Sequence, residues 1–317
     1  MKRKEKTAVI LAGLSGCMWG TIGLFVHVLE TYGIDAVTLT SGRFLIASAL
    51  LGIYLTAAKR ELLRIRLCDL PLFMIAGVFF LLFFNVSYGI TIEESSMSLA
   101  AVLLYTSPAI VSMLQVMLFH EKMTLRKVAA VVLSVAGCAL VSGIMKGSFA
   151  YPVSAYLWGF GSALGYSLYG LLSSFLLKRY RPLTVLFYAF LFAAAGSCTL
   201  GNLRGLLHMI AECPARLFWL VGAALVCNIL AYFCYNFALQ FLNPDYVMVV
   251  ASVEPVVASL LGLLVFKEPM DLFGVLGVGC ILAAIAVGNG TSETAEERKN
   301  SSLFPVLKGK NNSHKIC

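Results

Sequence analysis

Long apolar runs separated by short polar loops follow one another along most of the chain. Each run is about 20 residues long, the length that an α-helix needs to cross the hydrocarbon core of a bilayer. The pattern therefore predicts an all-α membrane protein with ten transmembrane helices. Their expected ranges are 7–29, 36–57, 70–91, 97–119, 125–144, 154–177, 183–201, 215–239, 245–266 and 270–288.

The chain matches itself when it is shifted by 147 residues without a gap. The matched pairs include Tyr88 with Tyr235, Pro108 with Pro255, Ser112 with Ser259 and Glu121 with Glu268. Apolar matches are common in membrane proteins, but prolines and glutamates in one register are not. Each half then has five predicted spans, and an odd number reverses the direction in which the second half enters the membrane. We expect two inverted five-helix repeats, at 1–146 and 152–290, with a site near the midplane between them.

Composition and charge agree with a membrane protein. The chain of 317 residues is 60% hydrophobic and 13% charged, whereas soluble domains carry about 25% charged residues. The net charge of +8 does not indicate nucleic-acid binding, because the basic residues lie in short loops between apolar runs.

The distribution of Lys and Arg predicts the orientation. Basic residues cluster in the N-terminal segment 2–6 and in every second loop, at 59–66, 122–127 and 178–181, and the tail carries five more. The loops on the opposite side have Lys146, Arg204, Arg216 and Lys267. By the positive-inside rule both termini are expected in the cytoplasm. Residues 291–317 are polar and are expected to form a flexible cytoplasmic tail.

The N-terminal apolar run and most of the cysteines are interpreted as parts of the membrane-spanning region. The apolar run from Thr7 to Leu29 is longer than the core of a signal peptide and no A-x-A site follows it, so we interpret it as a retained first span. The nine cysteines form no CxxC or Cys/His pattern. We expect no cofactor, no metal site and no disulfide framework.

Four local features stand out: Trp19-Gly20 in span one, Arg43-Phe44 in span two, the Glu-Pro of span nine, and a Glu at the end of the fourth span of each half. Together with the repeat, they resemble the ten-helix EamA-type branch of the drug/metabolite transporter superfamily. The resemblance covers about residues 7–290 and implies a bacterial inner-membrane exporter of amino acids or other small metabolites. It does not imply a particular substrate.

Glu254 is the leading candidate for coupling or substrate binding. It lies about ten residues into span nine, so by helical rise it is roughly 15 Å from either end. A carboxylate at that depth is costly, and it could carry a proton or pair with a cationic group of a substrate. The alternative is a hydrogen-bonded carboxyl that holds span nine against its neighbours. Pro255 and its twin Pro108 are expected to kink their helices and to belong to the moving frame.

Arg43 is the other strong charge inside a predicted span, and the repeat places Phe190 opposite it. Arg43 could contact an anionic group of a substrate or act in gating. The alternatives are a side chain that snorkels outward or one that caps carbonyls of a neighbouring helix.

A set of aromatic and amide side chains is expected to line a cavity at the same depth. Four of them lie on one face of span eight, at i, i+4, i+7 and i+8, and such a face is expected to point away from lipid. The predicted lining comprises Trp19, Asn85, Tyr88, Tyr105, Tyr169, Asn228, Tyr232, Tyr235, Asn236 and Glu254. It suits a zwitterionic or aromatic metabolite, although interhelical hydrogen bonding alone could explain individual members.

We therefore expect a secondary transporter in the cell membrane, with a small molecule as its substrate and a proton as a candidate coupling ion. The alternative is a flippase or carrier of a lipid-linked metabolite. The sequence has no HExxH, no GxSxG and no paired intramembrane aspartates, so we do not expect an enzyme. A channel is not favoured either, since no selectivity-filter pattern is present. The oligomeric state is left open.

Overall fold

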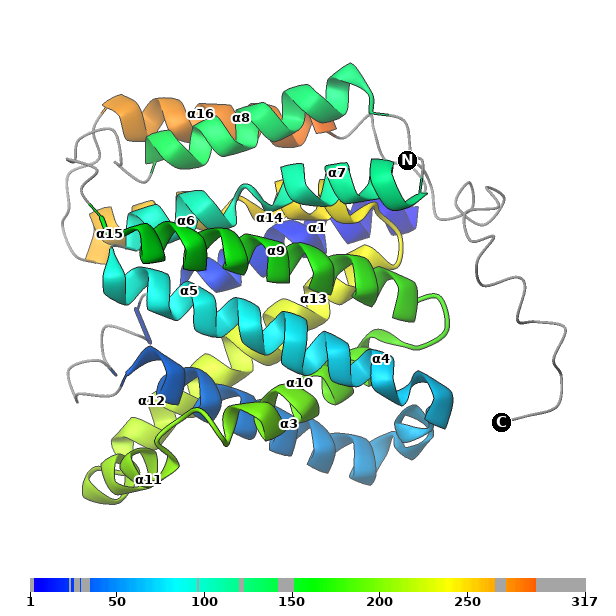
Figure 1. The fold of residues 1–317 in the computed structure, drawn as a ribbon, viewed down its shortest axis with the longest axis vertical. Helices are drawn as coiled ribbons and strands as arrows, with labels where there is room; N and C mark the ends of the chain where they lie inside the picture. The colour runs from blue at the N-terminus through cyan, green and yellow to red at the C-terminus, as the bar shows by residue number, and fades with distance from the viewer. Residues whose placement is uncertain are drawn as a thin grey trace, which may run out of the picture.

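The computed structural model describes residues 3–22, 24–25, 29, 35–95, 97–119, 123–141, 151–265 and 272–288. Within these residues the secondary structure is entirely helical (Figure 1). In chain order the elements are α1 (Arg3–Gly20), α3 (Ala36–Ala58), η1 (Arg60–Leu63), η2 (Leu67–Asp69), α4 (Leu70–Met74), η3 (Ile75–Leu82), α5 (Phe83–Glu94), α6 (Met97–Leu104), α7 (Ser107–Phe119), α8 (Leu125–Val141), α9 (Val153–Leu176), α10 (Pro182–Ser197), α11 (Leu203–Glu212), α12 (Ala215–Ala223), η5 (Ala224–Leu230), α13 (Ala231–Leu239), α14 (Pro244–Ala251), α15 (Glu254–Val265) and α16 (Leu272–Gly288).

Every predicted span falls on one of these helical segments. In the described part of the chain, four stretches are long and apolar enough to cross a membrane by themselves: Val37–Ala58, Leu67–Glu94, Leu99–Leu118 and Ala215–Leu239. The total of ten crossings and the side on which the termini lie stay predictions. The boundary between the predicted repeats, the tail 291–317, and the paired Glu121 and Glu268 lie outside the described residues.

The sequence did not predict helix α11, which lies in the loop between the seventh and eighth expected spans. One face of this short helix is apolar, and Leu206 on that face packs with Leu39 and Leu220. The helix was missed because ten residues are too few for a span and its charged residues suggested a loop.

The fourth span of each half is broken into two helices at the same place in the repeat. The first break lies at Tyr105–Thr106, between α6 and α7, and the second lies at Ser252–Val253, between α14 and α15. The two breaks are 147 residues apart. Pro108 and Pro255 are the second residues of the helices that follow, where a proline costs no hydrogen bond. The prolines thus start a new helix after each break and do not kink a continuous one.

Equivalent helices of the two halves pack against each other in opposite directions. Near the start of α3, the Ser41 hydroxyl donates to the carbonyl of Ser197 at the end of α10, at 3.3 Å. Further along α3, Gly52 lies against Phe187 near the start of α10. The pair α8 and α16 is also antiparallel: Ala130 faces Gly288, and Gly137 faces Ile281. Such antiparallel pairing is the geometry of two inverted repeats related by a two-fold axis.

Helix α1 lies directly against the break in the ninth expected span. A Cβ atom added at Gly16 would collide with the carbonyl oxygen of Ala251, and one at Gly20 would lie 2.8 Å from the carbonyl oxygen of Glu254. The absence of a side chain at these two positions lets the backbones touch. This contact places Trp19 beside the break.

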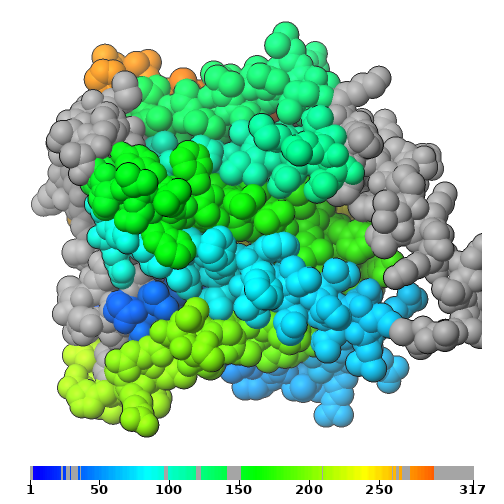
Figure 2. Space-filling model, viewed as in Figure 1, coloured from blue at the N-terminus to red at the C-terminus, as the bar shows by residue number. Residues whose placement is uncertain are grey.

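The outer surface is apolar over much of its area. Figure 2 shows α8, α7, α9 and α5 side by side on one face. Large exposed hydrophobic side chains on α7, α9, η3 and α5 include Met113, Met117, Leu157, Phe160, Leu164, Phe79 and Phe83. A soluble protein rarely exposes so much contiguous apolar surface, so this face suits contact with lipid.

Candidate functional site

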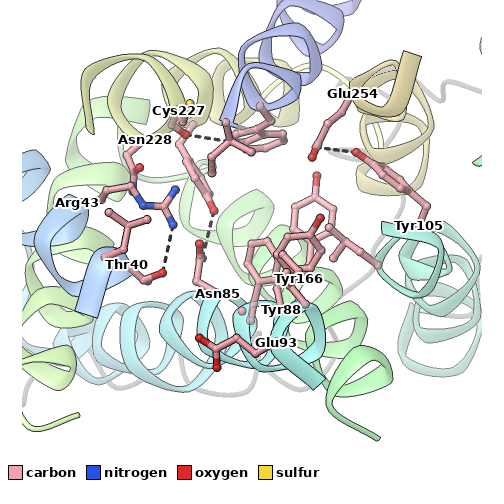
Figure 3. A pocket seen from close by; sticks show the side chains of 18 residues that line it. Thr40, Arg43, Asn85, Tyr88, Glu93, Tyr105, Tyr166, Cys227, Asn228 and Glu254 are labelled. Atoms are coloured by element: carbon pink, nitrogen blue, oxygen red, sulfur yellow. Dashed lines mark hydrogen bonds between the residues drawn. The ribbon is translucent and has the colours of Figure 1, made fainter. Parts of the chain in front are cut away.

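A cavity of about 120 Å³ lies between the two halves, at the level of the helix breaks (Figure 3). Both halves contribute to its wall. The lining residues are Trp19, Ile22, Leu39, Thr40, Arg43, Phe84, Asn85, Tyr88, Gly89, Ile92, Glu93, Leu104, Tyr105, Tyr166, Cys227, Asn228, Tyr232 and Glu254. The wall is largely aromatic and aliphatic with a small number of polar groups, which is typical of a small-molecule site.

One end of the cavity holds Glu254. This residue is the first of α15, so the positive end of the helix dipole favours its carboxylate. Its Oε2 accepts a hydrogen bond of 2.6 Å from the hydroxyl of Tyr105, which lies at the break between α6 and α7. The two breaks of the repeat therefore meet through these two side chains, one from each half.

The other end of the cavity holds Arg43, on α3. Its side chain is 7% exposed, and Nη2 donates to the Thr40 hydroxyl, one turn earlier on the same helix, at 3.2 Å. Asn228, in the π-helical segment η5, is 2% exposed and lies on the same side of the cavity (Figure 3). The site thus has a cationic end and an acidic end.

The middle of the cavity is built from residues that are equivalent in the repeat. Asn85 Nδ2 donates to the hydroxyl of Tyr232 at 3.4 Å, and the two positions are 147 residues apart. Trp19 and Tyr166 are also equivalent, and their ring centroids are 6.2 Å apart in an edge-to-face arrangement. Residues that contact their own repeat equivalents lie on the pseudo-two-fold axis, so the axis passes through the cavity.

Trp19 is fixed by the irregular backbone of the opposite half. Its Nε1 donates to the carbonyl oxygen of Cys227 at 2.9 Å. Cys227 lies in η5, where wider helical turns leave carbonyl groups available, and π-type turns often mark functional sites. The equivalent span of the first half has a π-helical segment too, η3.

The structure brings eight of the predicted site residues to the cavity wall and leaves five behind it. Those on the wall are Trp19, Arg43, Asn85, Tyr88, Tyr105, Asn228, Tyr232 and Glu254. Tyr169, Tyr235 and Asn236 are buried behind the wall, where Asn236 Nδ2 donates to the Tyr169 hydroxyl at 3.1 Å. Pro108 and Pro255 are also absent from the wall and act on the backbone.

Several wall residues were not predicted as site residues. Thr40 could have been found from its position three residues before Arg43, which places both on one helix face. Glu93 is exposed and also borders the cavity. Phe84 and Cys227 carry no polar signal that distinguishes them from packing residues.

The cavity extends toward one side of the bundle. Ile22, Leu39 and Ile92 line it, and each lies in or just beyond the half of its predicted span that is expected to face away from the cytoplasm. The opposite side is tied by polar contacts between the halves.

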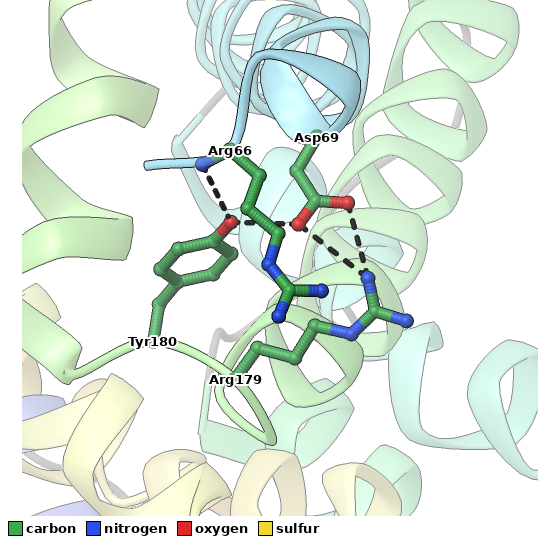
Figure 4. A network of polar contacts seen from close by, with 4 residues as sticks. All are labelled: Arg66, Asp69, Arg179 and Tyr180. Atoms are coloured by element: carbon green, nitrogen blue, oxygen red, sulfur yellow. Dashed lines mark hydrogen bonds and ion pairs between the residues drawn. The ribbon is translucent and has the colours of Figure 1, made fainter. Parts of the chain in front are cut away.

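Four residues form the first of these ties (Figure 4). Asp69 accepts hydrogen bonds from the Tyr180 hydroxyl at 2.6 Å and from Arg179 Nη1 at 3.2 Å. The Tyr180 oxygen in turn accepts from the backbone N–H of Arg66. Partial burial of Tyr180, together with its hydrogen bond to Asp69, raises the pKa of the phenol, which therefore stays a donor at neutral pH. We call Asp69, Arg179 and Tyr180 the loop latch.

A second tie is an ion pair inside the bundle near the same side. Lys127 Nζ, on α8, lies 3.1 Å from Asp245 Oδ2, on α14, and both side chains are less than 10% exposed. A buried pair of this kind is weak support for stability but costly to break from one side. Together the two ties join the first half to the second at the end of the bundle opposite to the one toward which the cavity extends.

The chain matches one family profile twice. The profile of the EamA-like transporter family covers residues 6–143 and 153–289. The chain belongs to the EamA-like transporter family. The two matches agree with the duplication that the repeat and the antiparallel helix pairs show.

Relatives and solved structures agree with this membership. The chain is 24% identical over 296 residues to the uncharacterized transporter YxxF of Bacillus subtilis (strain 168), with 90% of each chain covered. It is 22% identical over 287 residues to an uncharacterized transporter of Archaeoglobus fulgidus, covering 88% of this chain and 97% of the relative. A crystal structure with a TM-score of 0.73 and 18% identity covers 94% of this chain and 99% of that one, and it shows the fold. Family membership and apolar helices make this chain a membrane protein of a transporter family.

Proposed function

We propose that this protein is a secondary transporter of the cell membrane that exports amino acids or similar small metabolites. In this proposal ten helices cross the membrane, both termini are cytoplasmic, and the two inverted halves exchange conformations around the cavity. The observation that supports it best is the cavity itself. Its wall comes from both halves, lies at the helix breaks, and carries the buried Arg43 at one end and the half-buried Glu254 at the other.

The direction of export is proposed from the resemblance to exporters of this family, and the side toward which the cavity extends is compatible with it. The open side of the cavity faces away from the predicted cytoplasm, and the loop latch and the Lys127–Asp245 pair join the halves on the cytoplasmic side. An exporter releases its cargo from such an outward-facing state. The polar groups on the wall favour a water-soluble cargo over a lipid-linked one.

We further propose that Glu254 carries the coupling proton. It is half-buried in the cavity wall, and its hydrogen bond with Tyr105 links it to the break of the other half. A carboxylate that gains or loses a proton there would change the contact between the two breaks. Protonation would thereby be connected to the movement of the halves.

The test is transport in proteoliposomes by the purified protein. A panel of labelled amino acids and related metabolites is offered with and without an imposed pH gradient. We expect at least one zwitterionic compound to be transported, at a rate that the pH gradient increases. Transport of none of the panel would contradict the proposed cargo, and transport indifferent to the gradient would contradict proton coupling.

A further inference from the structure

Arg43 is a buried cation without a counter-ion. Among the described residues its guanidinium forms no ion pair, its Nε has no hydrogen-bond partner, and its one hydrogen bond goes to the neutral Thr40. A buried charge is normally paired, because removing it from water is costly. The cavity beside Arg43 is where a counter-ion can be bound.

Two structural roles expected for such a residue are not seen. The side chain does not snorkel to the surface, since it is 7% exposed. It does not cap a neighbouring helix either, because its hydrogen bond is to a side chain of its own helix. Glu254 does not neutralise it, because the two lie at opposite ends of the cavity (Figure 3).

The groups beside Arg43 suit an anion. Figure 3 shows Arg43, Thr40 and Asn228 on one side of the cavity. The guanidinium offers N–H donors in a fork that matches the two oxygens of a carboxylate. The Asn228 amide is 2% exposed and its Oδ1 has no hydrogen-bond partner among the described residues. No hydrogen bond to Oδ1 therefore fixes the orientation of the amide group, which can turn its NH₂ group toward a ligand.

We propose that Arg43, Thr40 and Asn228 form an anion subsite that binds a carboxylate of the transported molecule. This inference rests on the transporter function proposed above and adds the chemical group by which the cargo is recognised. Cargo with a carboxylate is held by the guanidinium, whereas its amide or amine analogue leaves Arg43 unpaired and is rejected.

The test uses acetate as the smallest carboxylate and acetamide as its neutral counterpart. The chain has three tryptophans, and Trp158 and Trp219 are outside the cavity wall. With Trp158→Phe and Trp219→Phe, the fluorescence of Trp19 reports on the cavity in protein reconstituted in nanodiscs. We expect a saturable change with acetate, with a Kd in the millimolar range because so small a ligand makes few contacts. Acetamide is expected to give none.

Variants of Arg43 show whether the signal comes from this subsite. We expect Arg43→Gln to weaken acetate binding at least about tenfold, and Arg43→Lys to weaken it less, because it keeps the charge without the fork. Arg64→Gln removes the same charge from an exposed loop and is expected to leave binding unchanged. Acetate binding equal in wild type and Arg43→Gln would overturn the subsite, and so would the absence of both a fluorescence change and a thermal shift with acetate.

A second pair of variants guards against loss of folding in Arg43→Gln. Thr40→Asp places a carboxylate next to the guanidinium, and we expect it to occupy the subsite, raise thermal stability and abolish acetate binding. Thr40→Asn adds a neutral group of the same shape as aspartate, so we expect it to weaken acetate binding without abolishing it and to leave thermal stability unraised. Acetate binding that survives Thr40→Asp would contradict the proposal. Acetate binding is measured without transport. A negative result for the anion subsite is therefore distinguishable from the finding that no compound of the metabolite panel is transported.

Discussion

Asn85 and Tyr232 occupy the same position in the two halves of the chain, and they are hydrogen-bonded to each other across the cavity. The distance from Asn85 Nδ2 to the Tyr232 hydroxyl is 3.4 Å, and the separation in sequence is 147 residues. The repeat thus carries an amide in one copy and a phenol in the other, and in this contact the amide donates to the phenol oxygen.

Removing this bond is expected to have a small effect. Asn85 Nδ2 also donates to the Leu81 carbonyl at 2.8 Å, so this nitrogen keeps a partner in Tyr232→Phe. We expect a loss of about 0.5–1 kcal/mol and a melting temperature lower by about 1–3 °C. Tyr54→Phe, at an exposed site on α3, is the matched control and is expected to melt like wild type. A drop of more than about 6 °C for Tyr232→Phe would mean that the phenol does more than make this bond.

The contact between α1 and the break in the ninth span predicts a strong effect of a single methyl group. In Gly16→Ala the new Cβ would meet the carbonyl oxygen of Ala251 and the side chain of Val253, so the helices must separate. Overpacking of this kind costs about 1–3 kcal/mol. Gly279→Ala is the control, because a Cβ there has no atom within 4 Å. Thermal melting in one detergent should rank Gly16→Ala well below wild type and Gly279→Ala at or above it, and the reverse order would contradict the packing.

The loop latch predicts a conformational effect at the side that is predicted to be cytoplasmic. Arg179 is 47% exposed, so solvent screens its pair with Asp69, which is worth about 0.5–1 kcal/mol. Arg179→Gln should therefore increase the population in which the loops separate by roughly 2–5-fold. Spin labels are attached to Cys68 and to Lys178→Cys in a protein that lacks the other cysteines. The distribution of distances between the two labels should then show a larger fraction at the longer distance.

Two comparisons give the latch experiment its controls. Arg181→Gln removes the same charge from an exposed position two residues away and should leave the distance distribution unchanged. Exchange of the two charges, in Asp69→Arg with Arg179→Asp, should restore part of the short distance. An Arg179→Gln distribution identical to that of wild type would show that Asp69 and Arg179 do not hold the loops.

The orientation in the membrane can be tested with two native cysteines. Cys68, in η2, is exposed on the predicted cytoplasmic side, and Cys213 lies before α12 on the opposite side. Single-cysteine proteins are treated with a membrane-impermeant maleimide in intact cells and in inside-out vesicles. We expect labelling of Cys213 in cells and of Cys68 in the vesicles. The opposite result would reverse the topology and would place the side toward which the cavity extends in the cytoplasm.

Much of the fold was readable from the sequence because its signals are local. Apolar runs of bilayer length, the register of Pro108 with Pro255, and the isolated charges of Arg43 and Glu254 do not depend on how the helices pack. The helix breaks were not predicted correctly. The chain leaves the helix at Ser252–Val253, before Glu254, so this carboxylate begins a new helix and does not lie in the middle of an old one. Backbone contact with α1 at Gly16 is a tertiary effect that no local pattern reports.

The composition of the cavity wall was partly predictable for a similar reason. Helical spacing placed Asn228, Tyr232, Tyr235 and Asn236 on one face, but it did not give the depth at which the cavity ends. Asn228 and Tyr232 line it, whereas Asn236, one turn further along, is bonded to Tyr169 in the core. The ends of a cavity depend on how neighbouring helices fill the space, and this is decided by packing between distant parts of the chain.

Glu254→Gln separates the two roles that remain for this carboxyl group. Glutamine keeps an oxygen that accepts the hydrogen bond from Tyr105, so the contact between the breaks survives while the ability to carry a proton is lost. If Glu254 is the coupling group, the variant should still exchange cargo across proteoliposomes at equal pH, but its net transport should no longer respond to a pH gradient. If the carboxyl is structural, the response to pH should be that of wild type.

Tyr105→Phe completes this comparison. It removes the donor and keeps the titratable carboxyl, so we expect slower transport, by several-fold, with the pH response retained. Transport by both variants is measured with the same cargo and corrected for the amount of protein in the vesicles. A pH response lost in Tyr105→Phe but retained in Glu254→Gln would assign the coupling to another group, because the acceptor of the proton would then be a residue other than Glu254.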